Sequence, residues 1–184
     1  MFDWQTLLFL QKTISYAAMP LLAMAAYTDI KTFRIPNVLV LSIGALGIVR
    51  LVLWHDPLTA IFAVAMVGLI FITGILLFSF RLVGGGDVKL LMASCLMIRY
   101  PDYFSFFTAM ALFGAVLAIT ITLLRLFAQS PIPLFLGPRV ASSLSAIRPV
   151  LPYGVAIAAA GIVTLLLQPM LFRYSVFYTS YSWW

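Results

Sequence analysis

Residues 58–80 read LTAIFAVAMVGLIFITGILLFSF, an apolar run that contains no charged side chain. A helix needs about 20 such residues to cross the hydrocarbon core of a bilayer. The rest of the chain has the same character, because its 184 residues are 64% hydrophobic and only 9% charged. Soluble domains carry about 25% charged residues. The composition therefore predicts a protein embedded in a membrane.

Further apolar stretches of helical length lie on both sides of this run. We predict an all-α, polytopic membrane protein with about six transmembrane helices, folded as a single domain over residues 1–184. Pro20 lies inside the first span, where a kink is expected rather than a break. The fourth span is short for a crossing, so Gly84–Asp87 also lies at membrane depth or water penetrates there. The expected spans are 6–27, 38–54, 58–80, 88–100, 104–127 and 150–170.

The distribution of Lys and Arg predicts the orientation, since cytoplasmic loops are enriched in both. The more basic side is expected to be cytoplasmic, which places both termini outside. The longest connection, 128–149, has a helical apolar face and is expected to form a short interfacial helix. The basic side collects Lys31, Arg34, Arg81, Lys89, Arg125, Arg139 and Arg148, and the other side collects Lys12, Arg50, Arg99 and Arg173.

The net charge of +6 does not indicate nucleic-acid binding, because the basic residues are scattered at the ends of apolar runs. Zinc-protease motifs are excluded, since the chain has no Glu and a single His, His55. Serine or cysteine catalysis would need that same His as its base, and it lies on the predicted outer side. No cofactor or metal site is expected.

Two of the five Asp residues stand out by position. Asp3, Asp56 and Asp102 fall at the terminus or in outer loops, whereas Asp29 and Asp87 both fall on the cytoplasmic side, where a polar or glycine-rich turn meets an apolar span. Either carboxylate alone could be an interfacial helix cap. Two on one face indicate the paired carboxylates of aspartic proteases, in which one activates water and the other donates a proton.

Glycine and proline residues flank these acids. Gly84, Gly85 and Gly86 precede Asp87, and they would let an extended substrate approach the backbone closely. A flexible turn before a helix cap would explain them as well. Pro152 and Gly154 are candidate substrate-path residues, although a helix start explains them nearly as well.

The chain resembles the type IV prepilin peptidases, which are GxGD aspartic membrane peptidases. The resemblance rests on Asp29 with Ile35-Pro36-Asn37, on Gly84-Gly85-Gly86-Asp87 with the following Val-Lys-Leu-Leu, and on the segment 151–158, LPYGVAIA. It spans residues 27–161. The resemblance implies that Asp29 and Asp87 are the catalytic pair that removes the leader of a prepilin at the cytoplasmic face of the inner membrane.

The sequence departs from the larger members of that family in one respect. Those members carry an additional N-terminal domain with paired cysteine motifs, linked to N-methylation of the cleaved product. This chain has a single cysteine, Cys95. It therefore resembles the short type that serves tight-adherence (Flp) pili, and we expect cleavage without methylation.

The predicted helix ends suggest roles for the two acids. Asp29 would lie at the C-terminal end of the first helix and Asp87 at the N-terminal start of the fourth, so the helix dipoles favour protonated Asp29 and ionised Asp87. Asp87 is thus expected to be the resting base, although Lys31 and Arg34 oppose this assignment. Lys89 is not expected to pair with Asp87, because the two lie about 200° apart around a helix.

Two other functions remain open from the residues alone. A small transporter could use Asp29 and Asp87 as proton or ion ligands, although the chain shows no internal repeat and the acids lie near the interface. A scaffold subunit of a pilus or secretion complex would need neither acid. The oligomeric state is not predicted.

Overall fold

The computed structural model describes residues 4–54, 57–81, 83–129 and 151–180, and within these ranges the chain forms helices and no strands, as expected. The helices are α1 (Trp4–Thr32), α2 (Asn37–Trp54), α3 (Pro57–Ser79), α4 (Gly85–Met97), the 3-10 helix η1 (Tyr100–Asp102), α5 (Tyr103–Gln129) and α8 (Tyr153–Ser180).

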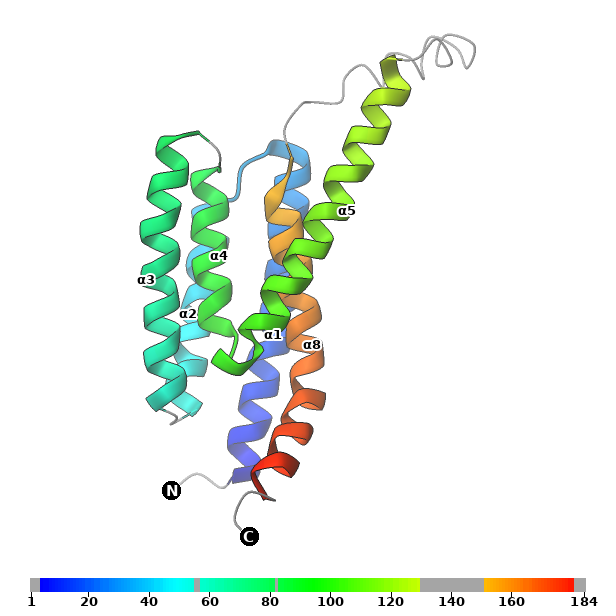
Figure 1. The fold of residues 1–184 in the computed structure, drawn as a ribbon. Coiled ribbons are helices and arrows are strands. Elements are labelled where there is room, and N and C mark those ends of the chain that lie inside the picture. Colours follow the sequence, from blue (N-terminus) through cyan, green and yellow to red (C-terminus); the bar gives the residue numbers. More distant parts are fainter. Residues whose placement is uncertain (1–3, 55–56, 82, 130–150, 181–184) are drawn as a thin grey trace.

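Successive α-helices run in opposite directions along a bundle (Figure 1). The C-terminal end of α1 and the N-terminal ends of α4 and α8 therefore meet at one end of the molecule. The start of α1 and the end of α8 lie at the other end. Segments that are far apart in the sequence thus come together at the end where Asp29 and Asp87 are found.

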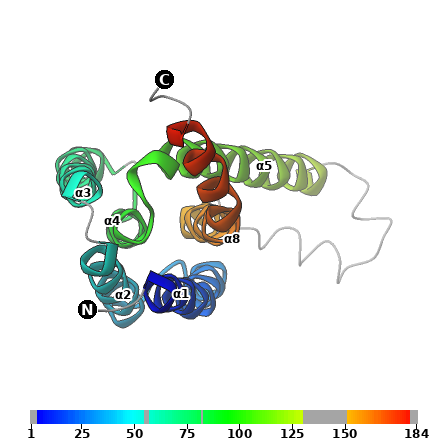
Figure 2. The same ribbon diagram turned by 90° about the horizontal axis from the view of Figure 1, so that it is seen from below.

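The shortest α-helix within the described residues, α4, lies in the middle of the bundle and packs against α2, α3 and α8 (Figure 2). Its residues Leu90, Ala93, Ser94, Cys95 and Met97 are buried. Small residues on the neighbouring helices allow this close packing, because backbones can approach only where side chains are small. As a result, α4 and its first-turn Asp87 are held from three sides.

The helices differ from the expected spans mainly at their ends. The first helix continues through Pro20 without a break and reaches Thr32, so Asp29 lies in its last turn and not beyond it. The fourth begins at Gly85, inside the glycine run, and the last begins at Tyr153 instead of residue 150. The predicted interfacial helix lies outside the described residues, except for 128 and 129, which belong to α5.

Two helices of the described chain are long and apolar enough to cross a bilayer, over Ala60–Ser79 and Tyr100–Phe127. Large apolar side chains on their outer faces, such as Ile72 and Val116, are more than half exposed. Such surfaces suit contact with lipid and would be unfavourable in water.

A buried cation joins three helices at the end of the bundle away from Asp29. Arg50 of α2 is 5% exposed, and its guanidinium donates hydrogen bonds to the Met97 carbonyl at the end of α4 and to Gln168 Oε1 of α8. A buried guanidinium is tolerated only when it is hydrogen-bonded. Arg50 therefore fixes the positions of α2, α4 and α8 relative to one another.

Candidate active site

Asp29 occupies the last turn of α1, next to the residue that ends the helix. The N–H of Phe33 donates to the Asp29 carbonyl at 2.9 Å, and Phe33 itself has a positive φ of 51°. This left-handed conformation is unusual for a bulky residue and stops the helix. The Asp29 side chain points inward and is 4% exposed.

Asp87 lies in the first turn of α4, three residues after the N-cap. Gly84 is extended at this position, with φ −73° and ψ 139°, and its carbonyl accepts the Asp87 N–H at 3.1 Å. A Cβ on Gly84 would lie 3.0 Å from Asp87 Oδ2. Because Gly84 has no side chain, its backbone passes directly beside the Asp87 carboxylate. The Gly84 N–H stabilises the ionised form of Asp87.

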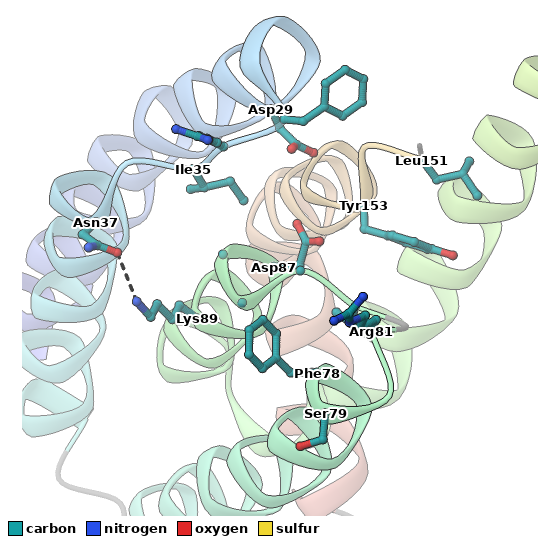
Figure 3. A pocket seen from close by; sticks show the side chains of 16 residues that line it. Asp29, Ile35, Asn37, Phe78, Ser79, Arg81, Asp87, Lys89, Leu151 and Tyr153 are labelled. Atoms are coloured by element: carbon teal, nitrogen blue, oxygen red, sulfur yellow. Dashed lines mark hydrogen bonds between the residues drawn. The ribbon is translucent and has the colours of Figure 1, made fainter. Parts of the chain in front are cut away.

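The two carboxylates meet at the N-terminus of α8, as Figure 3 shows. Both line one open cavity of about 1000 Å³. The backbone N–H of Gly154, in the first turn of α8, stabilises the charge of each of them. A Cβ on Gly154 would lie 2.7 Å from Asp29 Oδ2 and 2.8 Å from the Ile35 side chain, so this position has no room for a larger residue.

Both acids lie beyond the ends of the spans expected from the sequence, and burial raises the pKa of each. For Asp29, desolvation outweighs the N–H groups of Gly154 and Val155, and Oδ2 is buried without a hydrogen-bond partner among the described residues. For Asp87, burial and then the charge of Asp29 raise the pKa to about 6. The pair therefore retains one shared proton at higher pH than isolated carboxyls would.

The N-terminus of α8 alters the balance between the two acids. The sequence-based assignment considered only α1 and α4, and Asp29 and Asp87 do lie at opposite helix ends, as it required. However, the first turn of α8 directs the N–H groups of Gly154 and Val155 at Asp29, and Asp87 receives the N–H groups of Gly154 and Gly84. Each carboxylate thus has two stabilising N–H groups, and α8 contributes to both, which the assignment from α1 and α4 alone did not include.

The other residues expected from the sequence differ in their relation to the cavity. Gly84, Gly85 and Gly86 line it, whereas Gly154 and Pro152 are not among the lining residues. Gly154 still contacts Asp29, and Pro152 is buried, with its carbonyl accepting the Val155 N–H in the first turn of α8. Pro152 therefore belongs to the start of α8, which is the alternative to a substrate-path role that the sequence left open.

Lys89 lies on the cavity wall and points away from Asp87. Its Nζ hydrogen-bonds Asn37 Oδ1 at 3.3 Å, which connects the start of α4 to the start of α2 (Figure 3). This contact agrees with the expectation that Lys89 does not pair with Asp87.

Sequence reasoning missed several cavity residues. Phe33 and Arg81 are the two non-glycine residues with positive φ among those described, and both line the cavity. Strained backbone of this kind often lies at functional sites, but no sequence signal marks it at Phe or Arg. The other lining residues that were not singled out as site residues are Arg34, Ile35, Asn37, Phe78, Ser79, Val83, Lys89, Leu151 and Tyr153.

The cavity offers carboxylates, cations and backbone N–H groups. Among the described residues, no group of three or more His, Cys, Asp or Glu side chains comes together to hold a metal ion. The arrangement can bind an extended peptide along the glycine strip and present two coupled carboxyls to it.

The fold and site are those of a helical membrane protein with a paired-aspartate centre. The sequence model of the type IV leader peptidase family matches residues 16–119, which include both acids. The chain belongs to this family and is a leader-peptidase-like protease. Comparison with curated proteins and with solved structures gave no match. The α8 segment with Gly154 lies outside the matched residues, so its contribution is known from the geometry alone.

Proposed function

We propose that this protein is a prepilin peptidase that cleaves the leader of Flp-type prepilins with Asp29 and Asp87. The observation that carries the proposal is the meeting of these two carboxyls at one backbone N–H, that of Gly154. A structural cap would need one carboxylate at one helix end. Two coupled acids with raised pKa values, in an open cavity, are what peptide hydrolysis requires.

In the proposed reaction the pair carries one proton. The ionised carboxylate removes a proton from water, and the water oxygen attacks the scissile carbonyl carbon. The protonated carboxyl gives its proton to the carbonyl oxygen, and a tetrahedral diol forms. The carbon–nitrogen bond then breaks: the leaving amine takes the proton from the carboxyl that had deprotonated water, and a hydroxyl of the diol gives its proton to the other carboxylate as the new carboxyl group forms. The pair thereby returns to its starting state with one proton.

We assign one resting proton to the pair as a whole. The N–H groups of Gly154 and Val155 favour charge on Asp29, and those of Gly84 and Gly154 favour charge on Asp87. Either carboxyl can therefore be the base while the other holds the proton and polarises the carbonyl of the scissile bond.

The proposal includes the orientation and the surroundings of the site. We place six helices across the inner membrane, with the Asp pair facing the cytoplasm. Arg34, Arg81 and Lys89 lie around the cavity, and basic residues prefer the cytoplasmic side. The α4 helix, with 13 residues, is short for a crossing, which leaves its first turn accessible to water from that side.

A co-expression experiment tests this function. The protein is produced with a small Flp-type prepilin, and the prepilin is analysed by mass spectrometry for its length and its N-terminal mass. The proposal predicts a shortened product with an unmodified amino terminus. A product that carries an added methyl group would refute the absence of methylation. A prepilin that stays full length beside correctly inserted protein would refute the peptidase function and would make ion flux the next measurement.

A further inference from the structure

An apolar groove extends from the acid pair along the outside of the bundle. It has a volume of about 680 Å³ and is formed by four helices. Residues on one face of α3 and one face of α5 line its walls, and residues of α4 and α8 line its floor. Three residues, Val83, Asp87 and Tyr153, line both this groove and the cavity of the acid pair. The groove therefore continues from the candidate active site.

The walls have the dimensions of a site for a helix. The lining residues of α3 from Met66 to Leu77 recur at helical spacing, and so do those of α5 from Phe107 to Ala118. Each set covers one face over about 16 Å, at 1.5 Å per residue. A groove of this length matches three turns of a helix laid beside α3 and α5.

The α5 wall is built of small residues. Ala111, Gly114, Ala115 and Ala118 form one strip that faces the groove. Strips of small residues let a second helix approach closely in a membrane, where dispersion contacts and not water exclusion drive association. Acyl chains have no such requirement. The small-residue strip therefore favours a peptide helix over lipid as the occupant.

The junction of the two cavities matches a change in polarity. The cavity at the acid pair is lined by Arg34, Arg81 and Lys89, whereas the groove is lined almost entirely by apolar side chains. Asp87 lies where the two meet. A peptide with a polar segment followed by an apolar helix would place the junction of its two parts at the acid pair.

We propose that the groove between α3 and α5 binds the apolar helix of the substrate, which reaches the acid pair sideways from the bilayer. The inference rests on the proposed peptidase function and identifies the part of the substrate that is held. The helix docks against the small-residue strip of α5, and its polar N-terminal extension lies in the cavity at Asp29 and Asp87. Ala115 and Ala118 then act as substrate-binding residues.

Site-specific photo-crosslinking tests the docking. A photoreactive residue is placed at Ala115, in the groove, or at its neighbour Val116, which is 62% exposed and is not among the residues that line the groove. The probe is a synthetic peptide with a short polar leader and an apolar helix of about 20 residues, in lipid nanodiscs with the Asp29→Asn protein. An adduct at 115 but not at 116 is expected. Equal labelling at both positions, or adducts only with lipid or a second protein copy, would overturn the proposal.

Kinetics give a second readout. For the wild-type protein, kcat/KM is compared between this peptide and a short peptide that lacks the helix. Ala118→Trp fills the groove, so the preference for the helix-bearing peptide should fall by about tenfold or more, through KM. Val116→Trp adds the same side chain outside the groove and should keep the preference.

The crosslinking and kinetic measurements together distinguish failure of the helix-docking proposal from failure of the peptidase function. Cleavage of the helix-bearing peptide without an adduct at 115, and with the preference intact in Ala118→Trp, would refute the groove and leave the peptidase function standing. An adduct at 115 without cleavage by the wild type would support helix docking and refute the peptidase function.

Discussion

Gly154 lies directly against Asp29, so closely that a Cβ on the glycine would lie 2.7 Å from the Asp29 Oδ2 and 3.0 Å from its Cγ. The same residue provides the N–H that both acids share. The start of α8 is thus as much a part of the candidate site as the two Asp residues. The helix that completes the site begins more than 60 residues after Asp87 in the chain.

Gly154→Ala should therefore inactivate the protein while leaving it folded. The new methyl group must displace the Asp29 carboxylate, and a shift of about 1 Å in a reacting group can cost about 100-fold in rate. We expect a loss of that size in kcat, measured on purified protein in nanodiscs. Gly44→Ala is the matched control, because its Cβ would meet only Ala93 at an ordinary 3.9 Å. Full activity in Gly154→Ala would show that Asp29 need not occupy its present position.

Cleavage should decline as the pH rises. The pKa of Asp87 is raised to about 6 by burial and by the charge of Asp29, so the pair loses its shared proton as the pH rises through that value. Because the reaction needs one protonated and one ionised carboxyl, kcat should be highest below pH 6, fall about tenfold per pH unit well above 6, and fall again at the acidic pH where both carboxyls are protonated. A rate that stays constant up to about pH 8 would contradict this assignment.

Two glycines, one on α3 and one on α2, pack against α4, and the stability lost on changing each to alanine should respond differently to a second substitution in α4. A Cβ on Gly74 of α3 would lie 2.3 Å from Val88 Cγ1, whereas a Cβ on Gly47 of α2 would lie 2.7 Å from the Leu96 Cβ, which alanine retains, and 3.0 Å from the Leu96 backbone carbon. Either glycine-to-alanine change should cost about 1–3 kcal/mol of stability. Adding Val88→Ala should recover most of the loss for Gly74, since it removes the clashing methyl groups. Adding Leu96→Ala should not rescue Gly47. Thermal unfolding in detergent measures both double mutants.

Arg50→Met should destabilise the protein without altering the chemistry. The change leaves the Met97 carbonyl and Gln168 without their buried donor, and an unsatisfied buried polar group costs about 1–3 kcal/mol. The unfolding temperature should fall, while cleavage by the molecules that remain folded persists. Lys12→Met, at an exposed position of α1, is the control and should show no such fall. An unchanged unfolding temperature for Arg50→Met would show that Arg50 does not stabilise the contact of α2, α4 and α8.

The sequence predicted the fold class and the approximate positions of the helices because apolar runs of membrane length are a strong local signal. It also singled out Asp29, Asp87 and the glycines between α3 and α4. It could not predict that Asp29 contacts the start of α8, since that contact joins residues distant in the chain. The assignment of acid and base missed this third helix end for the same reason.

Other features have no local signal at all. The positive φ of Phe33 and of Arg81 is imposed by packing where helices end, and neither residue type favours that conformation. Arg50 was expected only as one of the charges on the outer side. The hydrogen bonds from Arg50 to α4 and α8 make its burial possible, and no pattern in the α2 sequence indicates them.

Single Asp-to-Asn variants test whether Asp29 and Asp87 act together as a catalytic pair. Asn keeps the shape of the side chain and cannot exchange a proton in the same way. Cleavage of a prepilin-type peptide is measured with purified wild type, Asp29→Asn and Asp87→Asn, each checked for equal unfolding temperature. We expect each variant to lose at least about 1000-fold in kcat, and the double variant to be no worse than either single one. A single variant that still cleaves at near wild-type rate would contradict the two-carboxyl mechanism.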